Sequence, residues 1–276
     1  MITSKKISSK IGIYSLLIAG VILSIGPFYW MLVGSTLPSG EIFHIPPKLL
    51  PGDHLAKNFQ SLNESLGIAK IFWNSLFIAL VYTFTCTLIS AMAGYAFAKF
   101  HFKGKNLFFF IILCTLMIPS QVTLIPLFEM MVSFNWLNTY QAIILPSLAS
   151  PFAIYLMRQN MKAVPDSIIE ASRVDGAGEL RIFFTIILPV VRPALAAVSI
   201  FLFMSQWNSL IWPLITLNSK EMFTLPVALS SLIGMARIDY GQVMLGTTLS
   251  TIPIMLFFLL LQKHFISGIL GGSVKE

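Results

Sequence analysis

The stretch FWNSLFIALVYTFTCTLISAMAGYAFA, residues 72–98, contains no acidic, basic or histidine side chain. A helix crosses the roughly 30 Å hydrocarbon core of a bilayer with about 20 apolar residues, so this stretch predicts a membrane-spanning helix. Similar apolar segments occupy residues 11–33, 107–128, 142–157, 193–214 and 241–262. We therefore predict an all-α polytopic membrane protein with six transmembrane helices, organised as a single transmembrane domain over residues 1–276.

Two of these segments have features of their own. The fourth, 142–157, is the shortest and contains Pro146 and Pro151, which predict a bent or partly unwound helix. The first, 11–33, is longer than the apolar core of a signal peptide and lacks a small-residue cleavage site after it. We expect it to remain in the protein as a spanning helix.

Composition agrees with a membrane protein. The 276 residues are 56% hydrophobic and only 11% charged, whereas charged residues make up about a quarter of a soluble domain. Cys86 and Cys114 both fall inside apolar segments, where we interpret them as small buried hydrophobes rather than as a disulfide or a metal pair.

The basic residues predict the orientation. With the amino terminus inside, thirteen of the eighteen Lys and Arg residues fall in cytoplasmic segments, as the positive-inside rule requires. Both termini are then cytoplasmic, and the net charge of +7 reflects topology rather than affinity for nucleic acid. We expect a multi-pass protein of the bacterial inner (cytoplasmic) membrane, with long outer connections at 34–71 and 216–240. The first of these is rich in Pro and Gly, which predicts an ordered, lid-like loop rather than a domain.

The cytoplasmic connection PDSIIEASRVDGAGELRIFFTIILP, residues 165–189, is the most informative stretch. It predicts a helix of about eight residues, a turn at Gly176 and Gly178, and a second helix. Pro165 prevents backward extension, and Ser167 with Glu170 has the spacing of a capping box. A helix this short needs a surface to dock on. Its small residues and mixed charges fit a protein partner, and they also fit an interfacial helix lying on lipid headgroups.

Residues 165–189 closely resemble the EAA loop of bacterial import-type ABC permeases. The fixed positions of that pattern are occupied by Glu170, Ala171, Gly176, Ile186, Leu188 and Pro189. Ser172 replaces the usual second Ala. The resemblance implies that the cytoplasmic ATPase contacts or is coupled through Glu170, Ala171, Ser172, Asp175, Gly176, Leu188 and Pro189.

Other stretches resemble the carbohydrate branch of that family, the maltose, multiple-sugar and arabinose-oligomer type. They are LPSL at 145–148, YLMR at 155–158, QWN at 206–208, WPL at 212–214 and the tail from Gln262 to Lys275. The resemblance implies a type I ABC importer permease fold with its core at 70–263. It also implies a second homologous permease, two cytoplasmic ATP-binding subunits, an extracytoplasmic sugar-binding protein and a carbohydrate substrate.

Polar residues within the fifth segment mark a candidate substrate pathway, because a polar side chain deep in a span tends to face a wet cavity or the bundle interior. The candidates are Ser205, Gln206, Trp207, Asn208 and Trp212. The alternative is that they join helices by hydrogen bonds. In the second segment, close helix packing is indicated instead by Thr83, Thr85, Thr87, Ser90 and Gly94.

No catalysis by this chain is expected. Gly104-Lys105 lacks the rest of a phosphate-binding loop, so ATP and Mg²⁺ belong to a partner, and we expect this chain to bind no cofactor or metal. The spans contain essentially no ionisable residue, which argues against a secondary transporter. His44, His54, His101 and His264 lie in connections without ligand spacing, which argues against an intramembrane enzyme. An ABC importer permease for a solute other than a sugar remains open.

Overall fold

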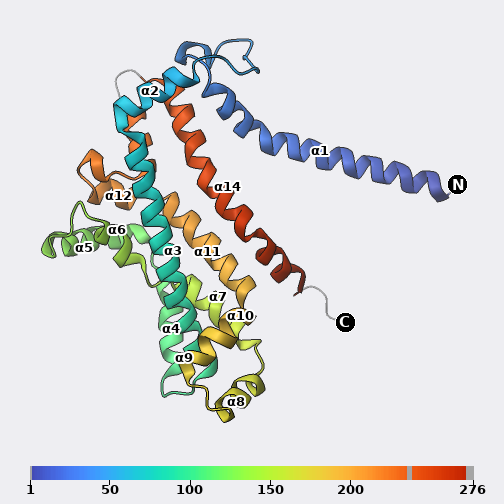
Figure 1. Cartoon of the computed structure of the whole chain (residues 1–276), viewed down its shortest axis with the longest axis vertical. Helices are drawn as coiled ribbons and strands as arrows, with labels where there is room; N and C mark the ends of the chain where they lie inside the picture. Colours follow the sequence, from blue (N-terminus) through green and yellow to red (C-terminus); the bar gives the residue numbers. More distant parts are fainter. Residues whose placement is uncertain (1, 235–237, 272–276) are drawn as a thin grey trace. The chain divides into compact units, whose positions relative to one another are not determined.

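The computed structural model describes residues 2–234 and 238–271. Over these residues the chain is helical and has no β-strand, which confirms the predicted all-α class. Two compact units are formed (Figure 1), one from the residues up to Ala69 with Leu229–Ile252, the other from Lys70–Ala228 with the described residues from Pro253 onward. The prediction of a single transmembrane domain over residues 1–276 remains a prediction.

The first unit contains α1 (Ile2–Gly34), the 3₁₀ turn η1 (Ser39–Glu41), α2 (Leu55–Leu66), the end of α13 (Leu225–Ile233) and the start of α14 (Tyr240–Gly271). Its small core consists of Val33, Leu37 and Ile42, packed against Trp30, Tyr240 and Met244. Helix α2 lies inside the connection 34–71 and was not predicted from the sequence.

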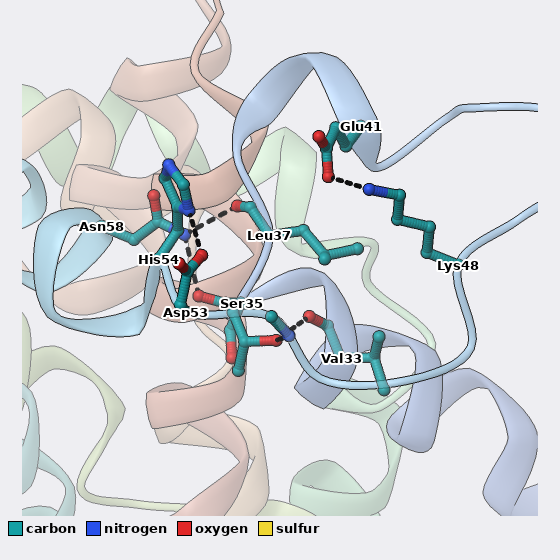
Figure 2. Close-up of polar contacts among 10 residues, drawn as sticks. Val33, Ser35, Leu37, Glu41, Lys48, Asp53, His54 and Asn58 are labelled. Carbon is teal, nitrogen blue, oxygen red and sulfur yellow. Dashed lines mark hydrogen bonds and ion pairs between the residues drawn. The ribbon is translucent and has the colours of Figure 1, made fainter.

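Hydrogen bonds order the loop between α1 and α2 (Figure 2). The Asn58 side-chain amide donates to the carbonyl oxygens of Ser35 and Leu37, at 2.8 and 2.9 Å. Lys48 pairs with Glu41, and the His54 ring pairs with Asp53 at 2.8 Å. Because Asn58 is buried, its amide satisfies two carbonyls that would otherwise lack partners. The connection is therefore an ordered loop, as predicted, while its action as a lid stays a prediction.

The second unit contains the remaining helices. They are α3 (Ile68–Lys99), α4 (Lys105–Thr115), α5 (Ser120–Ser133), α6 (Tyr140–Ile144), the 3₁₀ turn η2 (Leu145–Ser147), α7 (Pro151–Lys162), α8 (Asp166–Val174), α9 (Glu179–Ile182), the π-helical turn η3 (Phe183–Ile187), α10 (Leu188–Val190), α11 (Arg192–Trp207), α12 (Ile211–Thr216) and the 3₁₀ turn η4 (Lys220–Met222). Helices α3, α7 and α11 supply much of its hydrophobic core.

Helix α3 packs closely against both of its neighbours in this core. A Cβ placed on Gly94 would lie 2.7 Å from the Met157 Cβ and 2.9 Å from the Arg158 backbone nitrogen on α7. On the other side, the Thr87 hydroxyl lies 3.3 Å from the Ser199 hydroxyl of α11. The interpretation of Gly94 and Thr87 as helix-packing residues is therefore confirmed.

Cationic side chains cap the end of α3. Arg158 donates from Nε to the Phe97 carbonyl at 3.1 Å, and Lys105 donates to the carbonyls of Ala98 and Phe100 at 3.3 and 2.7 Å. The last carbonyls of a helix lack partners within the helix and carry partial negative charge, so cations stabilise this end.

Over the described residues, three long apolar helices and three bent helix pairs are long and apolar enough to cross a membrane. The long helices, Gly12–Gly34, Ile68–Lys99 and Tyr240–Lys263, correspond to the first, second and sixth predicted spans. The pairs are α4 with α5, bent by 97°, α6–η2 with α7, bent by 45°, and α9–α10 with α11, bent by 83°. The first two pairs correspond to the third and fourth predicted spans, whereas the third pair begins inside the connection 165–189 and shares only α11 with the fifth predicted span, 193–214. The predicted bend in the fourth span is confirmed, because the break falls at Leu148–Ser150, between Pro146 and Pro151.

Two predicted spans need correction. Segment 107–128 is not one continuous helix, because it breaks at residues 116–119, where Pro119 becomes the N-cap of α5. Segment 193–214 also breaks, because α11 ends at Trp207 and α12 begins only at Ile211. Ser205, Gln206 and Asn208 therefore lie at a helix end and the break after it, rather than halfway along a continuous span.

Candidate functional site

Helix α8 and the turn after it have the predicted helix–turn–helix form. The helix begins after Pro165, whose φ of −61° and ψ of 133° are extended, and it ends at Val174. The chain then reverses at Gly176, whose φ of +80° lies in the left-handed region that favours glycine. Gly178 has an ordinary φ of −72° as the N-cap of α9, so Gly176 alone supplies the unusual backbone of the turn.

The predicted capping box is wrong. Pro165 is the N-cap and makes no side-chain cap, so Ser167 lies already inside the first turn. Glu170 lies in the middle of the helix with its side chain exposed. The physical reason is that the helix begins at Asp166, two residues earlier than it would with Ser167 as its N-cap. Asp166, an acidic residue in the first turn, takes the role of stabilising the helix start.

One face of α8 is buried and the other is open. Ile169 points into the hydrophobic core of the second unit, whereas Glu170, Ala171, Asp175 and Gly176 are exposed and Ser172 is half-buried. The Ser172 hydroxyl donates within the helix, to the Ile168 carbonyl at 2.8 Å. The predicted coupling residues on α8 and its turn are thus brought together on one surface.

Two apolar residues that the sequence analysis overlooked extend this surface. Val174 is 87% exposed and Leu180 is 67% exposed, although both are large hydrophobes. Exposed hydrophobes beside small residues and charges are typical of a protein interface. Helical periodicity offered a signal, since at about 100° per residue Val174 lies about 140° from the buried Ile169. We call Ile168, Ala171, Val174, Gly176 and Leu180 the α8 surface.

Leu188 and Pro189 have a different position. They lie in α10, beyond the π-helical turn Phe183–Ile187, and both are half-buried. Leu188 packs against the hydrophobic core rather than standing on the α8 surface. Leu188 and Pro189 therefore lie in the connection between α9 and α11, where the chain bends by 83°.

Ion pairs hold both ends of α8. At its start, the Lys99 ammonium lies 2.6 Å from the Asp166 carboxylate, and this pairing lowers the pKa of Asp166 below its ordinary value. At its end, Arg173 donates from Nε to the Glu179 carboxylate at 2.7 Å, which raises the pKa of Arg173. The sequence analysis did not single out Lys99 or Glu179, because nothing in their spacing shows that they meet α8.

A cavity of about 590 Å³, lined by both polar and apolar side chains, lies elsewhere in the second unit. Four of the five pathway candidates line it, namely Ser205, Gln206, Asn208 and Trp212. Ser209, Leu210 and Ile211, which follow α11 in the chain, also line it, together with residues from other elements: Tyr82, Ser120, Gln121, Leu124 and Ser147. Sequence reasoning missed the second set because these residues come from α3, α5 and η2, far from α11 in sequence.

Trp207 does not line this cavity. Its side chain is 1% exposed, and it stacks on Phe203 and meets the edge of Phe72. Trp212, in contrast, lines the cavity while its indole Nε1 donates to the Ala142 carbonyl at 2.8 Å. That hydrogen bond holds the indole ring of Trp212 in place. Of the two predicted tryptophans, Trp212 alone therefore forms part of the cavity wall.

The cavity can form hydrogen bonds but carries no charge. Hydroxyl and amide groups supply its polar atoms, and none of its lining residues is Asp, Glu, Lys, Arg or His. Among the described residues, no group of three or more His, Cys, Asp or Glu side chains could hold a metal ion. The arrangement suits a neutral solute rich in hydroxyl groups.

The family model described as "Binding-protein-dependent transport system inner membrane component" matches residues 86–271. The chain is 42% identical to the lactose transport system permease protein LacG of Rhizobium radiobacter, over 95% of each chain. It is 36% identical to the arabinooligosaccharides transport system permease protein AraQ of Bacillus subtilis, over 92% of each. It is 32% identical to the sn-glycerol-3-phosphate transport system permease protein UgpE of Brucella abortus, over 98% of each.

A solved structure shares the fold. A chain of a bacterial ABC transporter involved in the import of the acidic polysaccharide alginate aligns with a TM-score of 0.79 at 22% identity, covering 93% of this chain and 97% of that one. The fold is therefore the type I ABC importer permease fold. Since the family model covers more than half of the chain and these relatives match it almost end to end, the chain belongs to the family of binding-protein-dependent transport system inner membrane components, as a permease subunit of an ABC importer.

Proposed function

We propose that this chain is one of two membrane-spanning subunits of a carbohydrate importer, and that the α8 surface is the seat of a separate cytoplasmic ATPase. The observation that carries the proposal is the exposure of Val174 and Leu180 beside Ala171 and Gly176, and the last two occupy fixed positions of the EAA pattern. Exposed apolar side chains cost free energy in water, which a docked partner would recover.

The partners follow from the same proposal. The sequence has no phosphate-binding loop, so a partner binds ATP and Mg²⁺ and hydrolyses the ATP. A second homologous permease completes the pore. An extracytoplasmic binding protein delivers the sugar, as in the related alginate transporter solved with an alginate pentasaccharide-bound periplasmic protein. The distribution of basic residues supports cytoplasmic termini and a cytoplasmic α8.

The uncharged cavity supports a carbohydrate over a phosphate ester. Of the three relatives named above, one is named for lactose, one for arabinooligosaccharides and one for sn-glycerol-3-phosphate. A phosphate in a cavity of low dielectric needs a cation or several N–H donors, whereas sugar hydroxyls pair with neutral amides and hydroxyls. Gln121, Gln206, Asn208 and the serines of the lining provide that second set. Trp212 adds an apolar face on which a sugar ring can pack.

The mechanism is a shift between two arrangements of the pore. ATP binding brings the ATPases together, and α8 moves with the ATPase on which it is seated. That movement favours the arrangement in which the cavity opens toward the binding protein, and hydrolysis restores the other. Each ligand shifts the equilibrium by its difference in affinity for the two arrangements.

The test is co-purification of the ATPase after changing the α8 surface. Val174→Asp places a charge where an apolar contact is expected, and Glu170→Lys reverses a charge beside it, so both should lose ATPase while still inserting with the second permease. Leu50→Asp is the matched control, because Leu50 is 77% exposed but lies in the loop between α1 and α2. If both α8 variants retain the ATPase fully, the ATPase does not bind at the α8 surface.

A further inference from the structure

Lys99 fastens the start of α8 to the end of α3. Its side chain is only 6% exposed, and its ammonium donates to the Val164 carbonyl at 2.5 Å as well as to the Asp166 carboxylate at 2.6 Å. A nearly buried ammonium requires partners, because desolvation without them costs several kcal/mol. Asp166 itself is largely exposed. Because Lys99 is the buried member of this contact, water could not replace its acceptors without a cost in free energy.

Tyr95 fastens the other end through Glu179. The Tyr95 hydroxyl donates to one carboxylate oxygen of Glu179 at 3.0 Å, and Arg173, in the last turn of α8, donates to the other at 2.7 Å. Tyr95 is 5% exposed. Glu179 thus connects the end of α8 to a buried hydroxyl on α3.

Both attachments leave from one face of one helix. Tyr95 and Lys99 are four residues apart on α3, so their side chains lie one turn from each other. Asp166 and Arg173 lie in the first and last turns of α8. The helices joined to α8 by the chain itself are α7 and α9, whereas α3 is distant from α8 in sequence (Figure 1). Besides the shared hydrophobic core around Ile169, these polar side chains link α3 to α8.

We propose that Tyr95, Lys99, Asp166, Arg173 and Glu179 form a clamp that makes α8 and the end of α3 move as one body. The clamp rests on the proposed function in that the movement it transmits comes from the ATPase. Exposed ion pairs contribute little, but each half of this clamp has a buried donor. If α8 swung away, Lys99 would lose the Asp166 carboxylate and keep only the Val164 carbonyl, and Glu179 would have to give up either Arg173 or Tyr95. The five are positioning residues, since none of them belongs to the α8 surface or lines the cavity beside Trp212.

Distance measurement between spin labels tests the clamp in the full chain. Labels at Ser167→Cys on α8 and Met92→Cys on α3 both replace exposed residues, in a background with Cys86→Ser and Cys114→Ala. In lipid nanodiscs without nucleotide or ATPase, the unaltered clamp should give one narrow distance distribution. Tyr95→Phe and Asp166→Asn should each raise the detached population roughly tenfold, the ratio expected for one hydrogen bond to a charged group.

Two variants separate the clamp from general structural damage. Tyr155→Phe removes a hydroxyl on α7 that makes no hydrogen bond to any described residue, so its distribution should match that of the unaltered chain. Asp166→Glu keeps the carboxylate and should restore the narrow distribution that Asp166→Asn loses. Equal widths in the unaltered chain, Tyr95→Phe and Asp166→Asn would overturn the clamp.

The same labels in the assembled importer test transmission. Addition of ATP and Mg²⁺ should leave the Ser167–Met92 distance unchanged in the unaltered clamp and should shift it in the doubly altered Tyr95→Phe, Asp166→Asn chain. A shift with the clamp intact, or no shift in either chain, would overturn transmission through α3. If no ATPase is retained at all, the proposed function fails, and the nanodisc measurement still decides whether the clamp holds.

Discussion

Replacing Gly94 by alanine brings a methyl group into the contact between α3 and α7. The added Cβ would lie 2.7 Å from the Met157 Cβ, 2.9 Å from the Arg158 nitrogen and 3.0 Å from the Met157 carbonyl carbon. Two of these three atoms are backbone, so a rotamer change cannot relieve the overlap and the helices must separate. Overpacking of this kind costs about 1–3 kcal/mol, and the better helix propensity of alanine returns at most about 1 kcal/mol.

The net loss should lower the apparent melting temperature of the purified protein in detergent by roughly 5 °C, given the usual relation for a chain of this size. Gly20→Ala is the matched control, because Gly20 lies within α1 and an added Cβ there meets nothing within 4 Å. Intrinsic tryptophan fluorescence during heating measures both. If Gly94→Ala and Gly20→Ala have the same melting temperature, Gly94 is not required for the close packing of α3 on α7.

Three further outcomes are expected. Gly176→Ala should weaken ATPase retention severalfold, because a φ of +80° costs an alanine about 1 kcal/mol. Gly178→Ala should not weaken it, because Gly178 has an ordinary φ of −72°. Equal effects of the two substitutions in co-purification would show that the left-handed backbone at Gly176 is not what matters. Asn208→Leu removes a hydrogen-bonding group from the cavity lining and should lower uptake of radiolabelled lactose or arabinooligosaccharides in an assembled complex; unchanged uptake of a sugar that the importer carries would leave Asn208 as packing. A cysteine at Gly104 should react with a membrane-impermeant maleimide only after the cells are opened. Labelling in intact cells would show that the predicted orientation is wrong.

Several features were determined by the sequence alone because they depend on near neighbours in the chain. The length of uncharged segments predicts spans whatever packs beside them. Pro146 and Pro151 predict a bend because proline removes a backbone donor wherever it stands in a helix. Gly176 in the fixed motif pattern predicts the turn, and the structure gives it the left-handed φ that only glycine adopts freely.

Other features depended on residues that meet only in the folded chain. Ser167 and Glu170 have capping-box spacing, but the helix begins earlier, after Pro165, so the capping box that this spacing predicts does not form. Trp207 and Trp212 look equivalent in the sequence, yet one is buried against Phe203 and the other lines the cavity, because α11 ends between them. Tyr95 and Glu179 are 84 residues apart and form a hydrogen bond that no periodicity encodes. Contacts of this kind are set by how helices pack, and helix packing is decided by the whole core rather than by any one segment.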